Sequence, residues 1–371
     1  MTFFSFVLRN IARQRVRTTL TVVGIAVGIT TVVALGAVAS GLRATAGAML
    51  RTGGADFIAA QKGSADLTFS TVSQQDWTAV AGRPDVERVT GVLMNVSRLG
   101  SNPYFALLGV KSEQLALAPP TLERGQLLRP GHDDDVMLGR RAASDLGADV
   151  GSTVTLLGRP FIVVGVYRGE MPLFDGGAYA PLGIVQQLTH REGLVTALYV
   201  KVKPGTDPRA VADAIEAGSD TLTTVSSVDE YGKVDQGVEA IDAANLAISL
   251  LAVLIGAVGV TNTMIMSVFE RTREIGILRA LGWRSSRIVR MIVGESLLLC
   301  LVAAVIGIAL GVLATKALLL VPAIESFLEP QYSSGLFLKA FVVGVGVGIA
   351  GALYPTVRAV RLSPMEALRH E

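Results

Sequence analysis

Four long apolar stretches dominate the pattern of hydrophobic and polar positions along the chain. They cover residues 20–42, 243–269, 291–318 and 336–357, and Glu295 is the only acidic residue that they contain. A helix needs about 20 apolar residues to cross the hydrocarbon core of a membrane. The pattern therefore predicts four transmembrane helices.

The region between the first two stretches, residues 43–242, has the shorter periodicities of a globular domain. Strands are indicated by β-branched and apolar runs between turn residues, and helices by apolar positions three or four residues apart. β structure is predicted at 86–99, 104–110, 136–167 and 197–202, with a hairpin joining 153–157 to 161–166, and helices at 73–81 and 208–217. The predicted fold class is a membrane protein with four transmembrane α-helices and a large mixed α/β extracytoplasmic domain between helices 1 and 2.

Pro119-Pro120 indicates a boundary inside this domain. We expect a smaller β-rich subdomain, at about 119–195, inserted into a subdomain built from the two flanks. The chain then divides into 1–42, with the N-terminal segment and first transmembrane helix; 43–242, the α/β domain; and 243–371, with the other three helices and the C-terminal tail.

Composition supports a membrane protein. Half of the residues are hydrophobic and 17% are charged, whereas about a quarter are charged in a typical soluble domain. The single cysteine, Cys300, excludes an intrachain disulfide and reads as a small buried apolar residue. The arginines before the first stretch and Ala37-Val38-Ala39 resemble parts of a signal peptide. However, the stretch is longer than the roughly 7–15 apolar residues of such a peptide, so we expect a retained anchor.

Charge is segregated along the chain in a way that predicts orientation. The N-terminal segment, the loop 270–290 and the tail 358–371 together hold 13 basic and 4 acidic residues, whereas 43–242 holds 18 basic and 24 acidic residues. Short basic segments stay in the cytoplasm. We therefore expect a multi-pass protein of the cell membrane with both termini cytoplasmic and the α/β domain outside.

Residues typical of catalysis or metal binding are not clustered in the sequence. The three histidines are His132, His190 and His370. They are far apart in the sequence, and none stands at a spacing typical of metal ligands. Asp133, Asp134 and Asp135 form an acidic run, for which a solvated turn is the simpler interpretation and a weak calcium site the alternative. We expect no catalysis, metal or cofactor in this chain, and no nucleic acid partner.

Three pairs of glycines lie one helical turn apart in the predicted spans. They are Gly24 and Gly28, Gly307 and Gly311, and Gly344 and Gly348. Small residues at this spacing let two helices approach closely. We expect contact faces, within the subunit or across a dimer; the alternative is that glycine is simply common in transmembrane helices.

Glu295 is a functional candidate because a carboxylate inside a membrane is costly to bury. It lies within about a turn and a half of the basic end of its span. Pairing with Arg271, Arg287 or Arg290 is therefore the favoured interpretation, over a role in substrate handling.

The loop between the second and third spans predicts a short helix at 273–282. Glu274 lies near its N-terminal end, where the helix dipole favours an acid, and Gly282 follows as a stop. The predicted apolar face consists of Ile275, Leu278 and Leu281, with Arg271, Arg273 and Arg279 beside it. Two interpretations stay open: an interfacial helix on anionic lipid, or a docking element for a cytoplasmic partner that moves the membrane helices.

This loop resembles the hallmark of the FtsX/MacB-like permease family of ABC transporters. The family's E-R-x-x-E-I-G-I-L-R-A-L-G run stands here without a gap from Glu270 to Gly282. The C-terminal run 354–369 is similar to the family's closing motif, and Arg9-Asn10 and the hairpin strand 161–166 are similar too. The resemblance spans nearly the whole chain, apart from residues 119–135.

The resemblance implies a type VII permease subunit that pairs with a second copy of itself or a paralogous permease. A MacB- or LolD-like ATP-binding subunit would dock on the coupling helix, at Arg273, Glu274, Ile275, Gly276, Leu278, Arg279, Leu281 and Gly282. The family's cytoplasmic tail motif falls on Pro364, Leu368 and Arg369. The 371 residues contain no G-x-x-x-x-G-K-[ST] phosphate loop, so we expect a split permease whose partner holds ATP and Mg²⁺.

Such a permease would expel or extract a hydrophobic or amphiphilic substrate by mechanotransmission, with an extracytoplasmic adaptor or membrane-fusion protein as a further candidate partner. The alternative is an FtsX-like regulator of an extracytoplasmic partner such as a cell-wall hydrolase. The 200-residue outer domain argues against it, since the division-type domain is about half as large. Lipoproteins, peptides, antibiotics and haem stay open as substrates.

Overall fold

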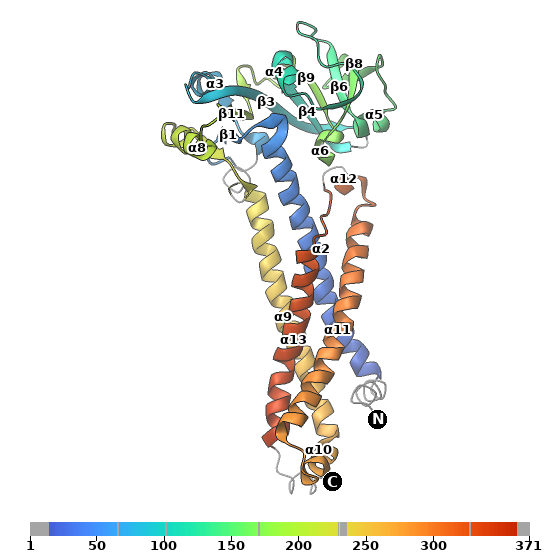
Figure 1. Cartoon of the computed structure of the whole chain (residues 1–371). Helices are drawn as coiled ribbons and strands as arrows, with labels where there is room; N and C mark the ends of the chain where they lie inside the picture. The colour runs from blue at the N-terminus through green and yellow to red at the C-terminus, as the bar shows by residue number, and fades with distance from the viewer. Residues whose placement is uncertain are drawn as a thin grey trace. The chain divides into compact units, whose positions relative to one another are not determined.

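A computed structural model of the chain (Figure 1) describes residues 15–64, 67–100, 102–169, 171–228, 230, 236–325 and 328–361. The chain forms two compact units. Of the described residues, those within 15–38, 243–317 and 332–361 belong to the helical unit, and those within 39–242 and 318–331 belong to the α/β unit.

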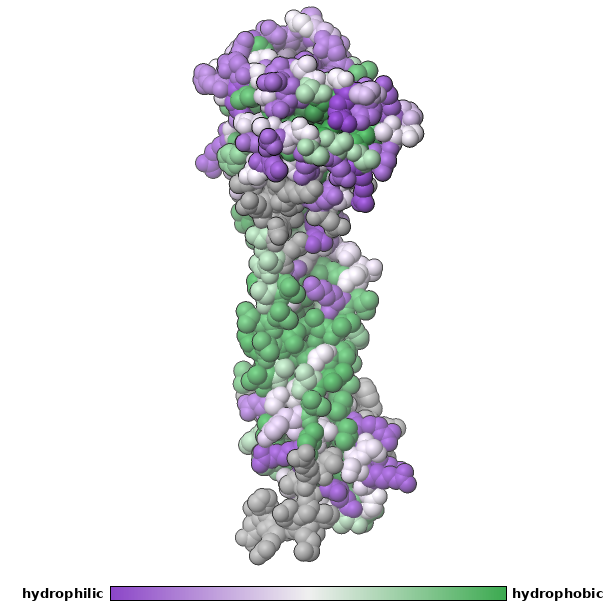
Figure 2. Space-filling view, turned by 90° about the vertical axis from the view of Figure 1, so that its left-hand side faces the viewer, coloured by the Kyte–Doolittle hydropathy of each residue, from purple (hydrophilic) through white to green (hydrophobic). Residues whose placement is uncertain are grey.

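Four long helices confirm the predicted spans. They are α2 (Arg15–Arg51), α9 (Gln236–Glu270), α11 (Ser285–Leu318) and α13 (Ser334–Arg361), and the short α10 (Thr272–Ala280) follows α9. Each long helix extends beyond the apolar stretch that predicted it. Figure 2 shows hydrophobic side chains gathered along the middle of these helices, as expected for segments that face lipid.

The glycine pairs pack helix against helix inside the helical unit. A Cβ atom at Gly307 would lie 2.7 Å from Ile29 Cβ of α2, and one at Gly311 would lie 2.7 Å from Val33 Cβ. The other packed members meet neighbours at 3.1–3.2 Å: Gly28 meets Ala252, Gly344 meets Ala304, and Gly348 meets Cys300. Gly24 has no heavy atom within 4 Å of its Cβ position and is the exception.

Hydrogen bonds from hydroxyl groups also connect the helices that pack at these glycines. Thr30 of α2 donates to the carbonyl of Gly307 at 3.1 Å, and Ser296 of α11 donates to that of Gly348 at 2.7 Å. Pro355 lies inside α13 and has no N–H to donate to the carbonyl of Gly351, four residues earlier. Thr261 of α9 donates to that freed carbonyl at 3.0 Å, so a neighbouring helix satisfies the group that the proline leaves open.

The α/β unit is built on one mixed sheet. Its strand order is β12-β1-β11-β3-β4-β9-β6-β8-β5, with β7 paired to β8, while β2 and β10 form a separate pair. The strands are β1 (Phe57–Gln61), β2 (Val72–Ser73), β3 (Val86–Leu99), β4 (Asn102–Val110), β5 (Thr121–Gly125), β6 (Asp135–Gly139), β7 (Thr153–Leu156), β8 (Arg159–Arg168), β9 (Ala178–Pro181), β10 (Leu194–Val195), β11 (Ala197–Val202) and β12 (Leu222–Val225).

Two apolar cores lie on the two faces of the sheet, because successive strand residues point to opposite sides. In β1, Phe57 belongs to the first core and Ile58 to the second. The first core is covered by α3 (Gln74–Ala81), α5 (Arg140–Leu146), α7 (Leu182–Leu188) and α8 (Pro208–Ala217). The second is covered by the last turns of α2, α4 (Ser112–Leu117) and α6 (Pro172–Asp175).

The long strand β3 is the joint between two parts of the sheet. Its residues 86–92 pair with β11, and its residues 93–99 pair with β4. Strands β5 to β9, which belong to the region 119–195, continue the sheet beyond β4, and this region shares the first core with the flanks. The insert predicted there therefore forms one end of a continuous sheet, and the structural joint falls earlier in the chain, inside β3.

Most predicted elements of this unit are confirmed. β3, β11 and α8 have the predicted limits, and Ser73 caps α3 by accepting from the backbone N–H of Asp76 at 3.1 Å. The β7–β8 hairpin is present, but it turns at Leu157 and Gly158, which both have positive φ. The prediction of β structure over 136–167 is wrong at Arg140–Leu146, which form α5.

The connector between α11 and α13 contains the short helix α12 (Pro322–Glu325) and belongs to the α/β unit. Arg141 of α5 forms an ion pair with Glu325 at 3.1 Å and donates to its carbonyl at 3.0 Å. A Cβ at Gly41 would lie within 2.3 Å of the Glu329 carbonyl. The connector is thus packed on the same body as the sheet.

Candidate functional site

The predicted coupling segment forms a compact turn at one end of the helical unit (Figure 1). α9 ends at Glu270, α10 covers Thr272–Ala280, and α11 begins at Ser285. Gly282 has φ +88, its N–H donates to Arg279, and the N–H of Trp283 donates to Leu278. These two bonds and the left-handed glycine are the Schellman motif, which confirms Gly282 as the helix stop.

The apolar face predicted for α10 is wrong in part. Ile275 is buried among Val268, Ile288 and Met291, but Leu281 is 74% exposed. The buried face of α10 instead consists of Thr272, Ile275 and Gly276. The reason is tertiary: α10 packs against α9 and α11, so their position decides which side of the helix is covered.

The outward face of α10 mixes apolar and charged side chains. Ile277, which the sequence analysis did not select, is 45% exposed and lies one turn before Leu281. The predicted docking residues fall into three groups: Arg273, Glu274, Leu281 and Gly282 are exposed, Leu278 and Arg279 are half-buried, and Ile275 and Gly276 are buried. Ile277 could have been found by the i, i+4 spacing to Leu281.

Arg271 and Glu295 form a bidentate ion pair beneath this segment. Nη1 of Arg271 lies 3.2 Å from Oε2 of Glu295, and Nη2 lies 3.4 Å from Oε1. Both side chains are largely buried, at 13% and 9% exposure. Of the three arginines that the sequence offered as partners for Glu295, the structure selects Arg271. The pair connects the α9–α10 junction to α11.

Other basic residues of this end contact aromatic rings. The Arg358 guanidinium lies 4.7 Å from the centre of the Phe269 ring, which links α13 to α9, and Arg287 lies 5.9 Å from the Trp283 ring. The tail residues Pro364, Leu368 and Arg369 and the N-terminal Arg9-Asn10 lie outside the described residues.

The acidic run of the α/β unit is engaged in ion pairs. Asp134 accepts from Arg159 at 2.7 Å, and Asp135 accepts from Arg129 at 2.6 and 2.8 Å. Burial of Asp135 disfavours its carboxylate, but the Arg129 hydrogen bonds outweigh this effect and hold the pKa of Asp135 below its usual value. Among the described residues, no three His, Cys, Asp or Glu side chains are grouped for a metal ion.

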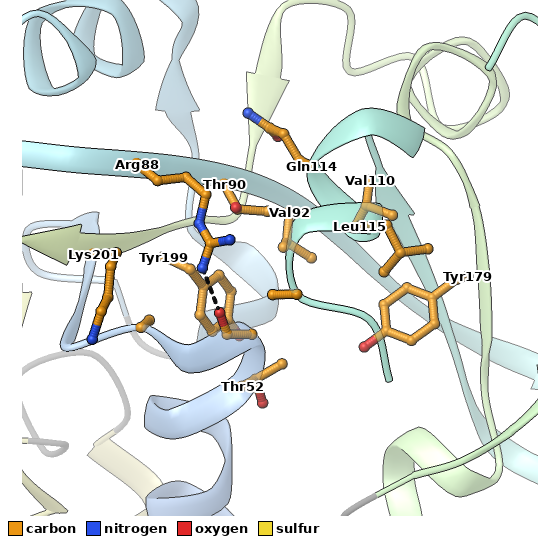
Figure 3. A pocket seen from close by; sticks show the side chains of 13 residues that line it. Thr52, Arg88, Thr90, Val92, Val110, Gln114, Leu115, Tyr179, Tyr199 and Lys201 are labelled. Atoms are coloured by element: carbon orange, nitrogen blue, oxygen red, sulfur yellow. Dashed lines mark hydrogen bonds between the residues drawn. The ribbon is translucent and has the colours of Figure 1, made fainter. Parts of the chain in front are cut away.

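A small pocket of about 40 Å³ opens in the α/β unit where α2 ends (Figure 3). Thr52, Gly53 and Ala55 of the link from α2 to β1 form one wall. The other lining residues come from β3, the end of β4, α4, β9 and β11: Arg88, Thr90, Val92, Val110, Gln114, Leu115, Ala118, Tyr179, Tyr199 and Lys201. Arg88 donates to the Gly53 carbonyl at 3.0 Å, which closes the link onto β3.

These features define a class: a multi-pass membrane protein with an α/β domain between its first two spans and a short packed helix between the next two. A family model for the MacB-like periplasmic core domain matches residues 18–217, more than half of the chain. A second model, the FtsX-like permease C-terminal, matches residues 246–364. The chain therefore belongs to the MacB/FtsX-like permeases of ABC transporters.

Individual relatives agree with this assignment. The chain is 27% identical to the macrolide export ATP-binding/permease protein MacB of Agrobacterium fabrum, over 96% of this chain and 59% of that protein. It is also 27% identical to MacB of Escherichia coli, over 98% of this chain and 60% of that protein. The chain thus spans about three fifths of the length of these curated relatives.

Solved structures of outer domains resemble the chain more weakly. The periplasmic region of MacB from Actinobacillus actinomycetemcomitans matches with a TM-score of 0.39 and 16% identity, covering 50% of this chain and 92% of that one. The extracellular domain of YknZ, a noncanonic ABC-type transporter from Gram-positive bacteria, gives 0.36 and 13%, covering 46% and 98%. Both scores are below 0.5, so the assignment rests on the family models.

Proposed function

We propose that this chain is the permease subunit of an ABC transporter and that a separate ATP-binding subunit docks on the outward face of α10. Nucleotide-driven closure of that subunit would move the helices and drive export or extraction of a hydrophobic or amphiphilic substrate. The observation that carries the proposal is the exposed apolar pair Ile277 and Leu281 on a helix whose opposite face is locked into the bundle.

The proposal depends on a rigid connection from α10 to the long helices. Ile275 is packed among residues of α9 and α11, and the Arg271–Glu295 pair joins the start of α10 to α11. Partly solvated helices transmit force only when such contacts keep them from sliding. A push on Ile277 and Leu281 would therefore reach the long helices instead of bending the loop.

The docking side would be cytoplasmic, with both termini on that side, in agreement with the charge asymmetry. In this proposal, ATP and Mg²⁺ would be held by the ATP-binding subunit. A second permease, as a further copy or a paralogue, would complete the assembly. An extracytoplasmic adaptor would contact the α/β unit.

The docking face can be tested by co-purification with a co-expressed ATP-binding subunit of the MacB- or LolD-like type. Ile277→Asp and Leu281→Asp should each reduce recovery of that protein at least tenfold, because a buried charge replaces an apolar contact. Leu117→Asp is the matched control, since Leu117 is a 65% exposed leucine of α4 in the α/β unit. Full recovery with both α10 variants would refute docking on this face.

The transport role needs a separate measurement. The purified complex in nanodiscs should hydrolyse ATP at a rate that changes when a hydrophobic or amphiphilic ligand is added. A rate that responds only to an extracytoplasmic hydrolase would instead favour a signalling function.

A further inference from the structure

Three arginines lie at the start of α11, next to the coupling segment. Arg284 directly precedes the helix, and Arg287 and Arg290 lie on its first turns, three residues apart, so these two are neighbours on the helix surface. All three side chains are exposed, and together they are the arginine cluster. The next residue, Met291, begins the apolar stretch of this span. The cluster therefore ends where the helix enters the hydrocarbon core.

The positive charge of the arginine cluster is not balanced by an ion pair within the part of the chain that the structure describes. The loop 270–290 holds six arginines and two glutamates, and Glu295 pairs with Arg271, outside the cluster. Arg290 donates from Nε to the Ser286 carbonyl at 3.3 Å, which leaves most of the five N–H donors of its guanidinium. An external anion therefore meets uncompensated positive charge here.

The spacing of the cluster along the helix fits the headgroup layer of a membrane. A helix rises about 1.5 Å per residue, so Arg287 and Arg290 lie about 4.5 Å apart along α11. The polar layer of one leaflet is about 5–8 Å thick, since a bilayer of about 40–45 Å has a hydrocarbon core of about 30 Å. Hydrophilic side chains follow the apolar band of the helices at this end (Figure 2). Both guanidinium groups can therefore contact phosphates of the same leaflet.

An aromatic ring accompanies the cluster. Trp283 is half-buried, and its ring centre lies 5.9 Å from the Arg287 guanidinium. Tryptophan is enriched at membrane–water interfaces because its ring is amphipathic. The positive end of the α11 dipole adds to the attraction for phosphate at the same turns. Aromatic and charged groups thus agree on a contact with headgroups.

We propose that the arginine cluster binds the phosphate groups of anionic phospholipids in the adjacent leaflet and so holds the start of α11 at the membrane surface. An acidic protein surface is the competing occupant, and the place of Arg290 directly before the apolar stretch favours lipid. The two interpretations that the sequence left open for this loop then apply to different residues: Ile277 and Leu281 of α10 contact the partner subunit, and the cluster contacts lipid. Lipid binding by the cluster does not rest on the proposed function.

Binding is tested by native mass spectrometry of the full chain in detergent, titrated with phosphatidylglycerol or with phosphatidylcholine of the same acyl chains. The native chain should bind the first phosphatidylglycerol at least tenfold more tightly than the first phosphatidylcholine, because only the former has a net negative charge. Arg287→Gln combined with Arg290→Gln should reduce this preference at least fivefold, and the corresponding lysine pair should keep most of it. Equal affinities in the native chain, or an unchanged preference in the glutamine variant, would overturn the proposal.

A matched control separates the cluster from the net charge of the loop. Arg273→Gln removes an exposed arginine of α10 and should keep the preference for phosphatidylglycerol. Circular dichroism verifies that each variant is folded. A loss in Arg273→Gln as large as that in the glutamine pair would show that the charge of the whole loop attracts lipid, and would refute the cluster as a site.

Co-purification with the ATP-binding subunit distinguishes this inference from the proposed function. The glutamine pair should recover that subunit as the native chain does, whereas Ile277→Asp should not. Full recovery with Ile277→Asp would count against docking on α10 and leave the lipid site intact. Loss of the subunit in the glutamine pair, together with an unchanged lipid preference, would assign the cluster to the protein partner instead.

Discussion

The ion pair between Arg271 and Glu295 is largely buried, at 13% and 9% side-chain exposure. Two charges lose most of their water there, and their mutual attraction compensates only while both are present. The pair joins residues 24 positions apart, so it also fixes how the α9–α10 junction is seated on α11. Its residues therefore serve the shape of the segment, and the exposed neighbour Ile277 is the one that we propose for docking.

Removing one partner of this pair should be worse than removing both. We expect Arg271→Met or Glu295→Leu to lower the free energy of unfolding by about 3 kcal/mol, and the double variant to recover most of that loss. Thermal unfolding in nanodiscs measures the effect. Arg273→Met, at an exposed position on the same turn, is the control. Additive losses in the double variant would show that the two side chains act independently.

Helix packing is decided at glycines where a neighbouring helix comes too close for a side chain. A Cβ at Gly307 would meet Ile29 Cβ at 2.7 Å and the Ala26 carbonyl at 2.8 Å, whereas a Cβ at Gly24 would meet nothing within 4 Å. Both glycines belong to small-xxx-small pairs, so spacing alone does not separate them. The two glycines differ only in whether a neighbouring helix lies close to them in the structure.

This difference predicts opposite outcomes for the same substitution. Gly307→Ala should lower the free energy of unfolding by about 1–3 kcal/mol, because α2 and α11 must move apart. Gly24→Ala should be neutral or slightly stabilising, since alanine favours the helix. The unfolding temperatures of the two variants, each compared with that of the native chain, test this prediction. Equal temperatures would mean that α2 and α11 do not meet closely at Gly307.

The sequence was sufficient for elements whose pattern is local. Long apolar runs located all four spans, and turn residues with β-branched runs located β3, β11 and the β7–β8 hairpin. α5 was missed because its seven residues form only about two helical turns, too few for a helical periodicity to be recognised. Gly147, which ends the helix in the left-handed conformation, was an available signal.

The remaining errors concern contacts between distant parts of the chain. The residues next to Ile275 and Ile277 in the sequence do not indicate which of the two faces α9 and α11. The buried side of α10 could therefore not be predicted from the sequence of α10 alone. The pairing of β3 also depends on distant residues, because its residues 86–92 pair with β11, about 110 residues later, and its residues 93–99 pair with β4, about 10 residues later. The pocket lining likewise comes from six separate segments.

The whole molecule has two bodies joined by more than one segment. α2 begins in the helical unit, and its last turns contribute Met49 and Leu50 to a core of the α/β unit. The connector 318–331 leaves the helical unit after α11, packs on the α/β unit, and returns to α13. The chain therefore passes between the two units within α2, within α9 and at both ends of the connector 318–331.

The ion pair between Arg141 and Glu325, which holds the connector on the α/β unit, gives a testable prediction. Arg141→Ala should raise hydrogen exchange of the backbone at 318–325 several-fold, while global stability falls by less than about 1 kcal/mol because the pair is partly exposed. Arg124→Ala, which removes an exposed pair with Asp149, should leave that exchange unchanged. Unaltered exchange in Arg141→Ala would show that other contacts alone hold the connector.

Cys300 has a practical consequence for all of these measurements. Its side chain is fully buried, and a Cβ at Gly348 would lie 3.2 Å from its sulfur, so α13 shields the thiol from reagents. It is also the only cysteine of the chain. A fluorophore or spin probe can therefore be attached at a single introduced surface cysteine without first replacing Cys300, which leaves the packed helices in their native form for spectroscopy.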